Sequence, residues 1–359
     1  MRRMVSCLER KNTFAMPTIN AMNDIYRRLK HLGFDAMFVR ELLLPDWWDD
    51  ELAKVPANRA VAEATISRHL KISIGRLATA DAELAIPSTV PVRLKSATRG
   101  TNPEVVRPSI AIAQRIATLL AQSLSSELPK FECSAAHTIR EEILSSHSTV
   151  TLESLIEYCW THGIIVGHLD RLPKVRGFRK FDGLALFANE HPCVLLAEKK
   201  DAPAWLAFHL AHELGHLMCR HVTPGSALLP DENLDRTIND SDENQADAFA
   251  NELLTGDPSP NINAIYGMTA EKLANTVQLH APGRQIDPAI FALVYGHTAD
   301  RMAVAVKALS LIHQDSGARS QIRRFLIQHI STSNLRDTDA HLLENLLMGH
   351  QSAEQKALR

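Results

Sequence analysis

The run AHELGH at residues 211–216 constrains this chain more than any other segment, because it has the H-E-x-x-H spacing. On a helix, side chains four residues apart lie one above the other, so His212 and His216 can direct two imidazole nitrogens at one metal ion. Glu213 stands beside them, within reach of a water molecule on that ion. Zinc lowers the pKa of bound water to about 7, and a carboxylate then takes its proton as the water attacks a carbonyl. The spacing therefore predicts amide hydrolysis with Glu213 as the catalytic base.

The alternative is a core cluster of hydrogen-bonded side chains, because 17 histidines in 359 residues raise the chance of accidental spacings. The runs WLAFHL at 205–210 and LMC at 217–219 make the helix apolar on nearly every side, so burial is expected. Two histidines and a glutamate buried there would each cost free energy unless they were paired or bound to a metal. The context therefore favours metal binding.

A strongly acidic stretch at 231–247, downstream of the motif, holds seven carboxylates opposed only by Arg236. They are Asp231, Glu232, Asp235, Asp240, Asp242, Glu243 and Asp247. Glu243 opens a helical pattern over residues 243–254 and lies on the face that also packs, so it is the candidate third ligand. Asp247, one turn further on, can accept the N–H of a ligand histidine and fix its tautomer. The alternatives are a capping carboxylate at Glu243, favoured by the helix dipole, and solvated loop charge for the remaining acids.

The motif helix and the pattern E-x-x-A-D-x-F-A-x-x-L-L at 243–254 together resemble the ImmA/IrrE family of metallopeptidases, which are gluzincins. The resemblance covers residues 135–256. It implies one zinc ion per chain, with Glu213 as the base and Asp247 supporting a ligand histidine. The implied metal ligands are His212, His216 and Glu243. Many members carry basic residues just before the motif helix, where this chain has APAW at 202–205, so its substrate contacts are expected to differ.

Segments before the motif helix predict a small sheet beside it. A helix follows Thr151, with apolar residues at helical spacing up to Trp160 and Gly163 just past its end. Three short apolar runs then have the length of strands. They lie at 164–166, 184–187 and 194–196. In this class of peptidase an edge strand binds the substrate backbone, and residues 183–188 and 193–197 are both candidates for that strand.

The whole chain is predicted to be α+β and mainly helical. A gluzincin-like peptidase domain, with a small sheet of three or more strands beside the H-E-x-x-H helix, is flanked by helical N- and C-terminal domains. The expected division is 1–21 disordered, 22–86 helical, 87–108 a proline-rich linker, 109–258 the peptidase domain with its core at 135–256, and 259–359 helical. Helices in the last region are expected near 269–281, 287–314, 319–331 and 338–358. Support of the fold is the default role of that region, and a sensor, a lid or a dimerisation unit is the alternative.

Peptide hydrolysis also needs a donor to the developing oxyanion, and four side chains are candidates for this role or for substrate contacts. They are His209, His221, Tyr266 and His280. His209 lies one turn before His212 on the metal-facing stripe, whereas the other three could fold back from downstream. A structural role is the alternative for each. Cys219 could also cap the metal as a thiolate, although its side chain points about 60° away from the ligand stripe.

Residues 62–77 resemble the helix-turn-helix of repressor-type regulators. Arg68, His69 and Lys71 would be available to contact DNA phosphates. No strong basic excess accompanies the pattern, and a plain helical bundle explains the same periodicity. DNA binding is therefore an alternative for this domain.

Composition argues against several other classes of protein. The apolar runs fall short of the roughly 18 residues of a transmembrane helix, so no membrane partner is predicted. Residues 1–7 are basic but lack the apolar core of a signal peptide. Five cysteines without paired spacing fit reduced thiols in a cytoplasm. The formal net charge of -2 gives no general attraction to nucleic acid.

The leading interpretation is a cytoplasmic zinc metallo-endopeptidase that is regulatory and site-specific. The family resemblance implies that its substrate is a helix-turn-helix repressor, whose cleavage releases genes of mobile elements, stress responses or defence systems. The alternative is a DNA-binding regulator or antitoxin whose zinc site is structural and which cuts no peptide bond. Either protein could act as a homodimer.

Overall fold

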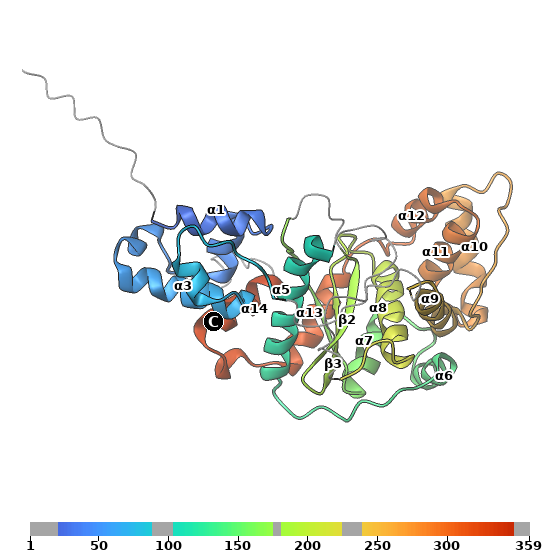
Figure 1. Cartoon of the computed structure of the whole chain (residues 1–359). Coiled ribbons are helices and arrows are strands. Elements are labelled where there is room, and N and C mark those ends of the chain that lie inside the picture. Colours follow the sequence, from blue (N-terminus) through green and yellow to red (C-terminus); the bar gives the residue numbers. More distant parts are fainter. Residues whose placement is uncertain (1–20, 88–102, 175–180, 225–238, 348–359) are drawn as a thin grey trace, which may run out of the picture.

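The computed structural model describes residues 21–87, 103–174, 181–224 and 239–347. Figure 1 shows an elongated molecule with the N-terminal helices at one end, a small sheet and its covering helices in the middle, and a helical unit at the other end. The segment expected to be disordered, 1–21, lies outside the described residues except for its last residue. No helix in the described ranges is long and apolar enough to cross a membrane.

The N-terminal end consists of short helices around a buried arginine. Its elements are α1 (Asn23–His31), α2 (Ala36–Phe38), η1 (Val39–Leu43), η2 (Asp50–Lys54), α3 (Pro56–Leu70) and α4 (Ile74–Ala78). Arg28 of α1 donates hydrogen bonds to the backbone carbonyls of Arg76, Leu77 and Thr79, at 2.8, 2.7 and 2.9 Å. Carbonyls at a helix C-terminus have no partner within the helix, so the guanidinium satisfies them and fixes the end of α4 on α1.

The helices of the expected helix-turn-helix, α3 and α4, do not present the predicted phosphate contacts. Arg68 pairs with Asp339 of α14 (Asp337–Leu347), with Nε and Oδ1 3.3 Å apart. His69 is fully buried, and this burial lowers its pKa to about 3, so the ring is neutral at pH 7. Lys71 remains exposed. Packing against α14 therefore takes up two of the three side chains, which corrects the expectation that all three are available.

A long helix begins inside the stretch expected to be a linker. Residues 88–102 lie outside the described residues, but α5 (Pro103–Gln122) starts well before Pro108 and contains it. Proline is tolerated near a helix start and disfavoured further in. The apolar side chains that follow Pro108 pack against the sheet, and this burial outweighs the helix-breaking tendency of the proline.

Within the described residues three strands form the sheet, which confirms the predicted α+β class. They are β1 (Ile165–His168), β2 (Gly183–Ala188) and β3 (His191–Leu196), in the order β1-β3-β2. β2 and β3 are antiparallel, joined by a tight turn in which Asn189 has a left-handed φ of 57°. β1 runs parallel to β3. Because β3 is paired along both edges, it cannot accept a substrate strand, which rules out 193–197 and leaves β2 as the candidate.

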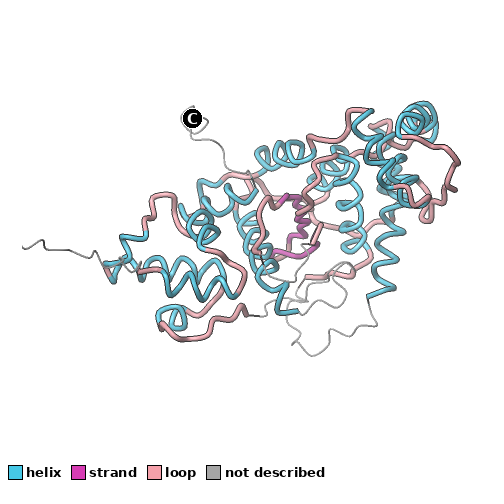
Figure 2. The backbone as a smooth tube through the Cα atoms, turned by 90° about the horizontal axis from the view of Figure 1, so that it is seen from above, coloured by secondary structure: helices cyan, strands magenta, loops and turns pink. Residues whose placement is uncertain are grey.

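Helices cover both faces of the sheet. Figure 1 shows α5 on one side of β2 and β3 and α8 (Pro203–Met218) on the other, and Figure 2 shows the strands enclosed by helices. α7 (Leu152–Thr161) packs on α8 and β1, and it begins at the predicted cap, where Thr151 Oγ1 accepts a 3.2 Å hydrogen bond from the Ser154 amide. α6 (Ala136–Ser146) and α9 (Asn239–Thr255) complete this side of the molecule.

The C-terminal region divides into two parts rather than forming one domain. The first part holds α10 (Ala270–His280), η4 (Pro282–Arg284), α11 (Pro288–Thr298) and α12 (Met302–Leu311). The helix expected at 287–314 is thus two helices, with Asp300 between them at a left-handed φ of 52°. The second part holds α13 (Ala318–His329), η5 (Thr332–Asn334) and α14. α13 and α14 return to pack on β1, so they belong to the central layer.

Candidate metal centre

The motif helix α8 is buried along most of its length. Pro203 occupies its first position, where a missing N–H costs nothing, and the apolar residues that follow pack on β2, β3 and α9. This packing carries the polar motif residues inside, because they lie on the same helix. His212, Glu213 and His216 are only 2, 5 and 3 % exposed. Such residues require partners in the interior.

A glycine inside the motif sets how closely the second helix approaches. A Cβ atom at Gly215 would lie 2.9 Å from the Cα atom of Ala246 on α9 and 3.0 Å from its carbonyl oxygen. No side chain larger than hydrogen fits between these backbones. Glu243 lies one turn before Ala246 on the same helix, so the close crossing brings its carboxylate to the histidines.

We expect Gly215→Ala to separate α8 from α9 and to weaken metal binding, although alanine is the better helix former. Overpacking of this kind costs about 1–3 kcal/mol, so the thermal midpoint of the metal-free protein should also fall. Zinc affinity by chelator competition and thermal melts measure the two effects. Gly283→Ala is the control, because a Cβ there meets no atom within 4 Å. Unchanged zinc affinity in Gly215→Ala would contradict the role given to the close crossing.

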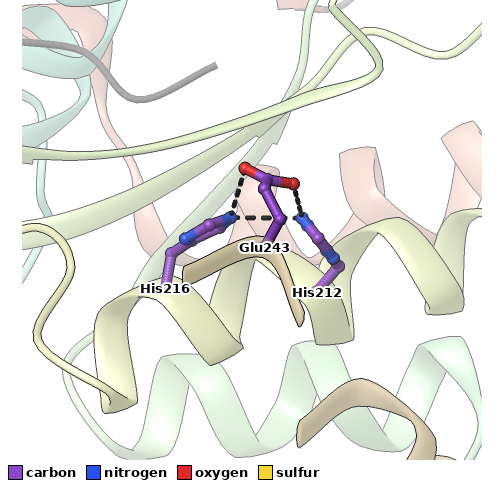
Figure 3. Close-up of side chains that lie close together, drawn as sticks. All are labelled: His212, His216 and Glu243. Carbon is purple, nitrogen blue, oxygen red and sulfur yellow. Dashed lines mark hydrogen bonds and ion pairs between the residues drawn. The ribbon is translucent and has the colours of Figure 1, made fainter. Parts of the chain in front are cut away.

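Three residues with ligand-type atoms converge at the crossing of α8 and α9. Figure 3 shows the two imidazole rings and the Glu243 carboxylate turned toward one another. His212 Nε2 lies 3.1 Å from His216 Nε2. Of the Glu243 carboxylate oxygens, Oε2 lies 3.4 Å from His212 Nε2 and Oε1 lies 3.6 Å from His216 Nε2. All three residues are buried. Glu243 lies in the second turn of α9, which begins at Asn239, so it is not the helix-capping carboxylate of the alternative interpretation.

The distances between the imidazole nitrogens and the Glu243 oxygens fit a metal ion with tetrahedral coordination. Tetrahedral zinc with ligand distances of about 2.0–2.1 Å places neighbouring ligand atoms roughly 3.3 Å apart, inside the observed range. Two neutral imidazoles and one carboxylate are also a common donor set for a zinc ion that keeps a fourth position open. The residues therefore fit the group that the motif implies, on geometry as well as on chemistry.

The outer nitrogen of His212 is held by a carboxylate. Its Nδ1 lies 2.7 Å from Oδ1 of Asp247, one turn after Glu243 on α9. An ionised carboxylate can only accept, so Nδ1 carries a hydrogen, and Nε2 is the nitrogen whose lone pair a metal would use in the neutral ring. The Asp247 side chain itself is 60 % exposed. Asp247 is thus placed where the sequence predicted it.

His221 lies behind His216, away from the converging atoms. Its Nδ1 is 3.0 Å from Nδ1 of His216, and its Nε2 faces Oδ1 of Asp242 at 3.7 Å. A donor to an oxyanion would have to face the open side of the centre. The structure instead places His221 against the outer nitrogen of a candidate ligand, a position that the sequence did not predict.

The other three predicted contacts are not brought to the centre. Nε2 of His209 turns to Oε2 of Glu198 at 3.8 Å, and together with Asp182 these two side chains form a second group with metal-ligand atoms close together. Tyr266 is fully exposed. His280 is exposed at the end of α10, a helix that packs on α11 and α12. Sequence order alone could not place Tyr266 and His280, because they lie on separate elements, whereas His209 shares α8 with the motif and its Nε2 faces Glu198.

The predicted base lies against the edge strand. A Cβ at Gly183, the first residue of β2, would lie 2.8 Å from Cγ of Glu213 and 2.9 Å from its Oε1. The absence of a side chain at Gly183 leaves room for the carboxylate in this position. Glu213 thus lies between the motif helix and the start of β2, a contact that nothing in the sequence apart from the glycine itself could indicate.

Two expectations from the sequence remain: a metal cap by the Cys219 thiolate, and the acidic stretch that follows the motif helix. Burial raises the pKa of the Cys219 thiol, and this disfavours the thiolate that a metal cap would need. The acidic stretch is described from Ser241 onward at side-chain level. Asp231, Glu232, Asp235 and the side chain of Asp240 lie outside it.

A comparison with protein families identifies the domain that carries this centre. The family described as the IrrE N-terminal-like domain, peptidase family M78, matches residues 162–261. Residues 162–261 are therefore similar to this peptidase family. The IrrE N-terminal-like domain includes the sheet, α8 and α9, and therefore every residue of the centre. Comparison with curated proteins and with solved structures found no match.

Proposed function

We propose that this chain is a zinc metallo-endopeptidase whose metal is held by His212, His216 and Glu243. The observation that carries the proposal is the convergence of three buried side chains from two helices, with the imidazole nitrogens 3.1 Å apart and a Glu243 oxygen 3.4 or 3.6 Å from each. The similarity of residues 162–261 to a peptidase family supports it. The chemistry supplied by zinc, when bound, is polarisation of the scissile carbonyl and acidification of the attacking water.

Residues of the chain itself would carry out the proton transfers and hold the ligand histidine in position. Glu213 takes the proton from the attacking water and delivers it to the leaving amide nitrogen. Its carboxylate lies against Gly183, at the start of β2. Asp247 accepts the Nδ1 hydrogen of His212 and so keeps Nε2 directed at the centre.

The substrate is proposed to bind as an added strand along the free edge of β2. Within the described residues no strand pairs with that edge, because β2 is hydrogen-bonded to β3 alone. The first residue of β2, Gly183, touches Glu213, so a peptide extended along this edge would pass beside the base. Backbone hydrogen bonds of this kind supply affinity without a strong demand for sequence.

The substrate class proposed is a helix-turn-helix repressor, cut at one site under regulation. Its basis is the resemblance of the motif residues to the ImmA/IrrE family. The proposed place of action is the cytoplasm, which fits the free thiols of the four cysteines in the described ranges. The predicted DNA-binding side chains lend no support to the alternative of a DNA-binding regulator, because Arg68 and His69 are engaged with α14 or buried.

The test is incubation of the zinc-loaded protein with purified helix-turn-helix repressors, followed by mass spectrometry of the products. We expect cleavage at one site, lost with a chelator and restored by added zinc. Single-stranded DNA and extra metal should be included as candidate activators. Repressors that remain intact under every condition would contradict the proposed substrate class.

A further inference from the structure

Beyond the ligands and the base, His216 has an ordered set of partners on its outer side. The chain reverses after α8 through Arg220, at a left-handed φ of 60°, and the His221 amide donates to the His216 carbonyl at 2.9 Å. The two rings meet nearly edge-on, with centroids 5.2 Å apart. The His221 side chain is only 7 % exposed. This turn therefore packs one imidazole directly behind another.

The two facing nitrogens fix each other's protonation. Nδ1 of His216 and Nδ1 of His221 are 3.0 Å apart, so one must donate and the other accept. Nε2 of His216 faces His212 and Glu243, where a metal needs its lone pair, so the proton of His216 belongs on Nδ1. Nδ1 of His221 is then the acceptor, and the proton of His221 lies on Nε2.

A carboxylate, that of Asp242, lies on the far side of His221, next to its Nε2. Asp242 Oδ1 is 3.7 Å from His221 Nε2, too long for a direct hydrogen bond but within the range of electrostatic attraction. A negative charge there favours the hydrogen on Nε2 of His221. Asp242 immediately precedes Glu243 on α9. This helix therefore carries the candidate ligand Glu243, the carboxylate of Asp247 that contacts His212 directly, and the carboxylate of Asp242 that faces His216 through His221.

We propose that His221 and Asp242 are positioning residues that hold His216 in the tautomer able to bind zinc. The inference rests on the proposed zinc site. His212 is held by a carboxylate directly, whereas His216 is held by a carboxylate acting through a second imidazole. Outer partners of metal-bound histidines change metal affinity by about 10–100-fold when removed.

The test compares His221→Leu with His221→Asn in the full-length chain. Leucine removes the acceptor, whereas the amide oxygen of asparagine takes the place of Nδ1 and can still accept the His216 hydrogen. We expect His221→Leu to lower zinc affinity by about 10–100-fold in chelator competition and His221→Asn to restore most of the loss. Asp242→Asn should have a smaller effect in the same direction. His137→Leu, at an exposed position on α6, is the control and should bind zinc like the parent.

Nitrogen-15 NMR of the histidines in the zinc-loaded protein gives a second readout that a purely structural role would not produce. We expect His216 to carry its hydrogen on Nδ1 and His221 to carry its hydrogen on Nε2. Unchanged zinc affinity in His221→Leu, or equal losses in the leucine and asparagine variants, would overturn the proposal. So would a hydrogen on Nδ1 of His221.

These outcomes are independent of peptide cleavage. A protein that binds zinc in a His221-dependent way but cuts no repressor would contradict the proposed function alone. A protein that cuts repressor while His221→Leu binds zinc normally would contradict the positioning role alone.

Discussion

Glu213→Gln should leave zinc binding intact and lower the rate of repressor cleavage by about a hundredfold to ten-thousandfold, the range for loss of a general base. Glutamine has nearly the same shape, so it fits the space beside Gly183. It cannot take a proton from water at neutral pH. Metal content by atomic emission and single-turnover cleavage rates measure the two properties separately.

The control for this substitution is Glu271→Gln, the same chemical change at an exposed carboxylate on α10. It should bind zinc and cleave at the parent rate. Cleavage by Glu213→Gln at the parent rate would exclude Glu213 as the base. Loss of zinc in that variant would instead show that Glu213 contributes to the metal site.

Glu243→Gln should lower zinc affinity by more than roughly a hundredfold, beyond the range for an outer partner. The substitution removes the negative charge and one of the two oxygens that face the imidazole nitrogens at 3.4 and 3.6 Å. Two nitrogen atoms 3.1 Å apart then remain without an anion to complete the donor set. Chelator competition measures the affinity, and cleavage at saturating zinc shows how much activity survives.

Asp247→Asn is the matched comparison for Glu243→Gln, because it makes the same type of change one turn along α9. Its carboxylate contacts Nδ1 of His212 and not the centre, so the expected loss is the smaller 10–100-fold. Equal losses in the two variants would contradict the division between a ligand and a supporting residue. Parent-like affinity in Glu243→Gln would remove Glu243 from the metal site.

The sequence predicted the elements of the fold well where periodicity was strong. The Thr151 cap, the three strands and most C-terminal helices lie near their expected residues. The prediction from sequence was wrong where contacts between distant segments set the structure. Pro108 argued for a linker, yet α5 runs through it because the helix buries apolar side chains on the sheet. α13 and α14 return to β1, which nothing in their own sequences required.

For the site, the sequence was most informative within single helices. His212, Glu213 and His216 were singled out because helical geometry fixes the relation of residues three and four apart. Glu243 and Asp247 followed from a second periodic segment and from the family resemblance. The candidates Tyr266 and His280 could not be sorted in this way, because their distance from the centre depends on how separate elements pack.

By itself, the sequence determined the chemical character of the site: two imidazoles and a carboxylate on one turn, with further carboxylates on a second amphipathic segment. The tertiary structure decided which groups meet. It brought α9 onto Gly215, placed Glu213 against Gly183 and put His221 behind His216. The reason is physical, since local backbone geometry fixes contacts within a helix. Contacts between helices depend on small residues at the crossing and on the burial of apolar faces, which belong to the chain as a whole.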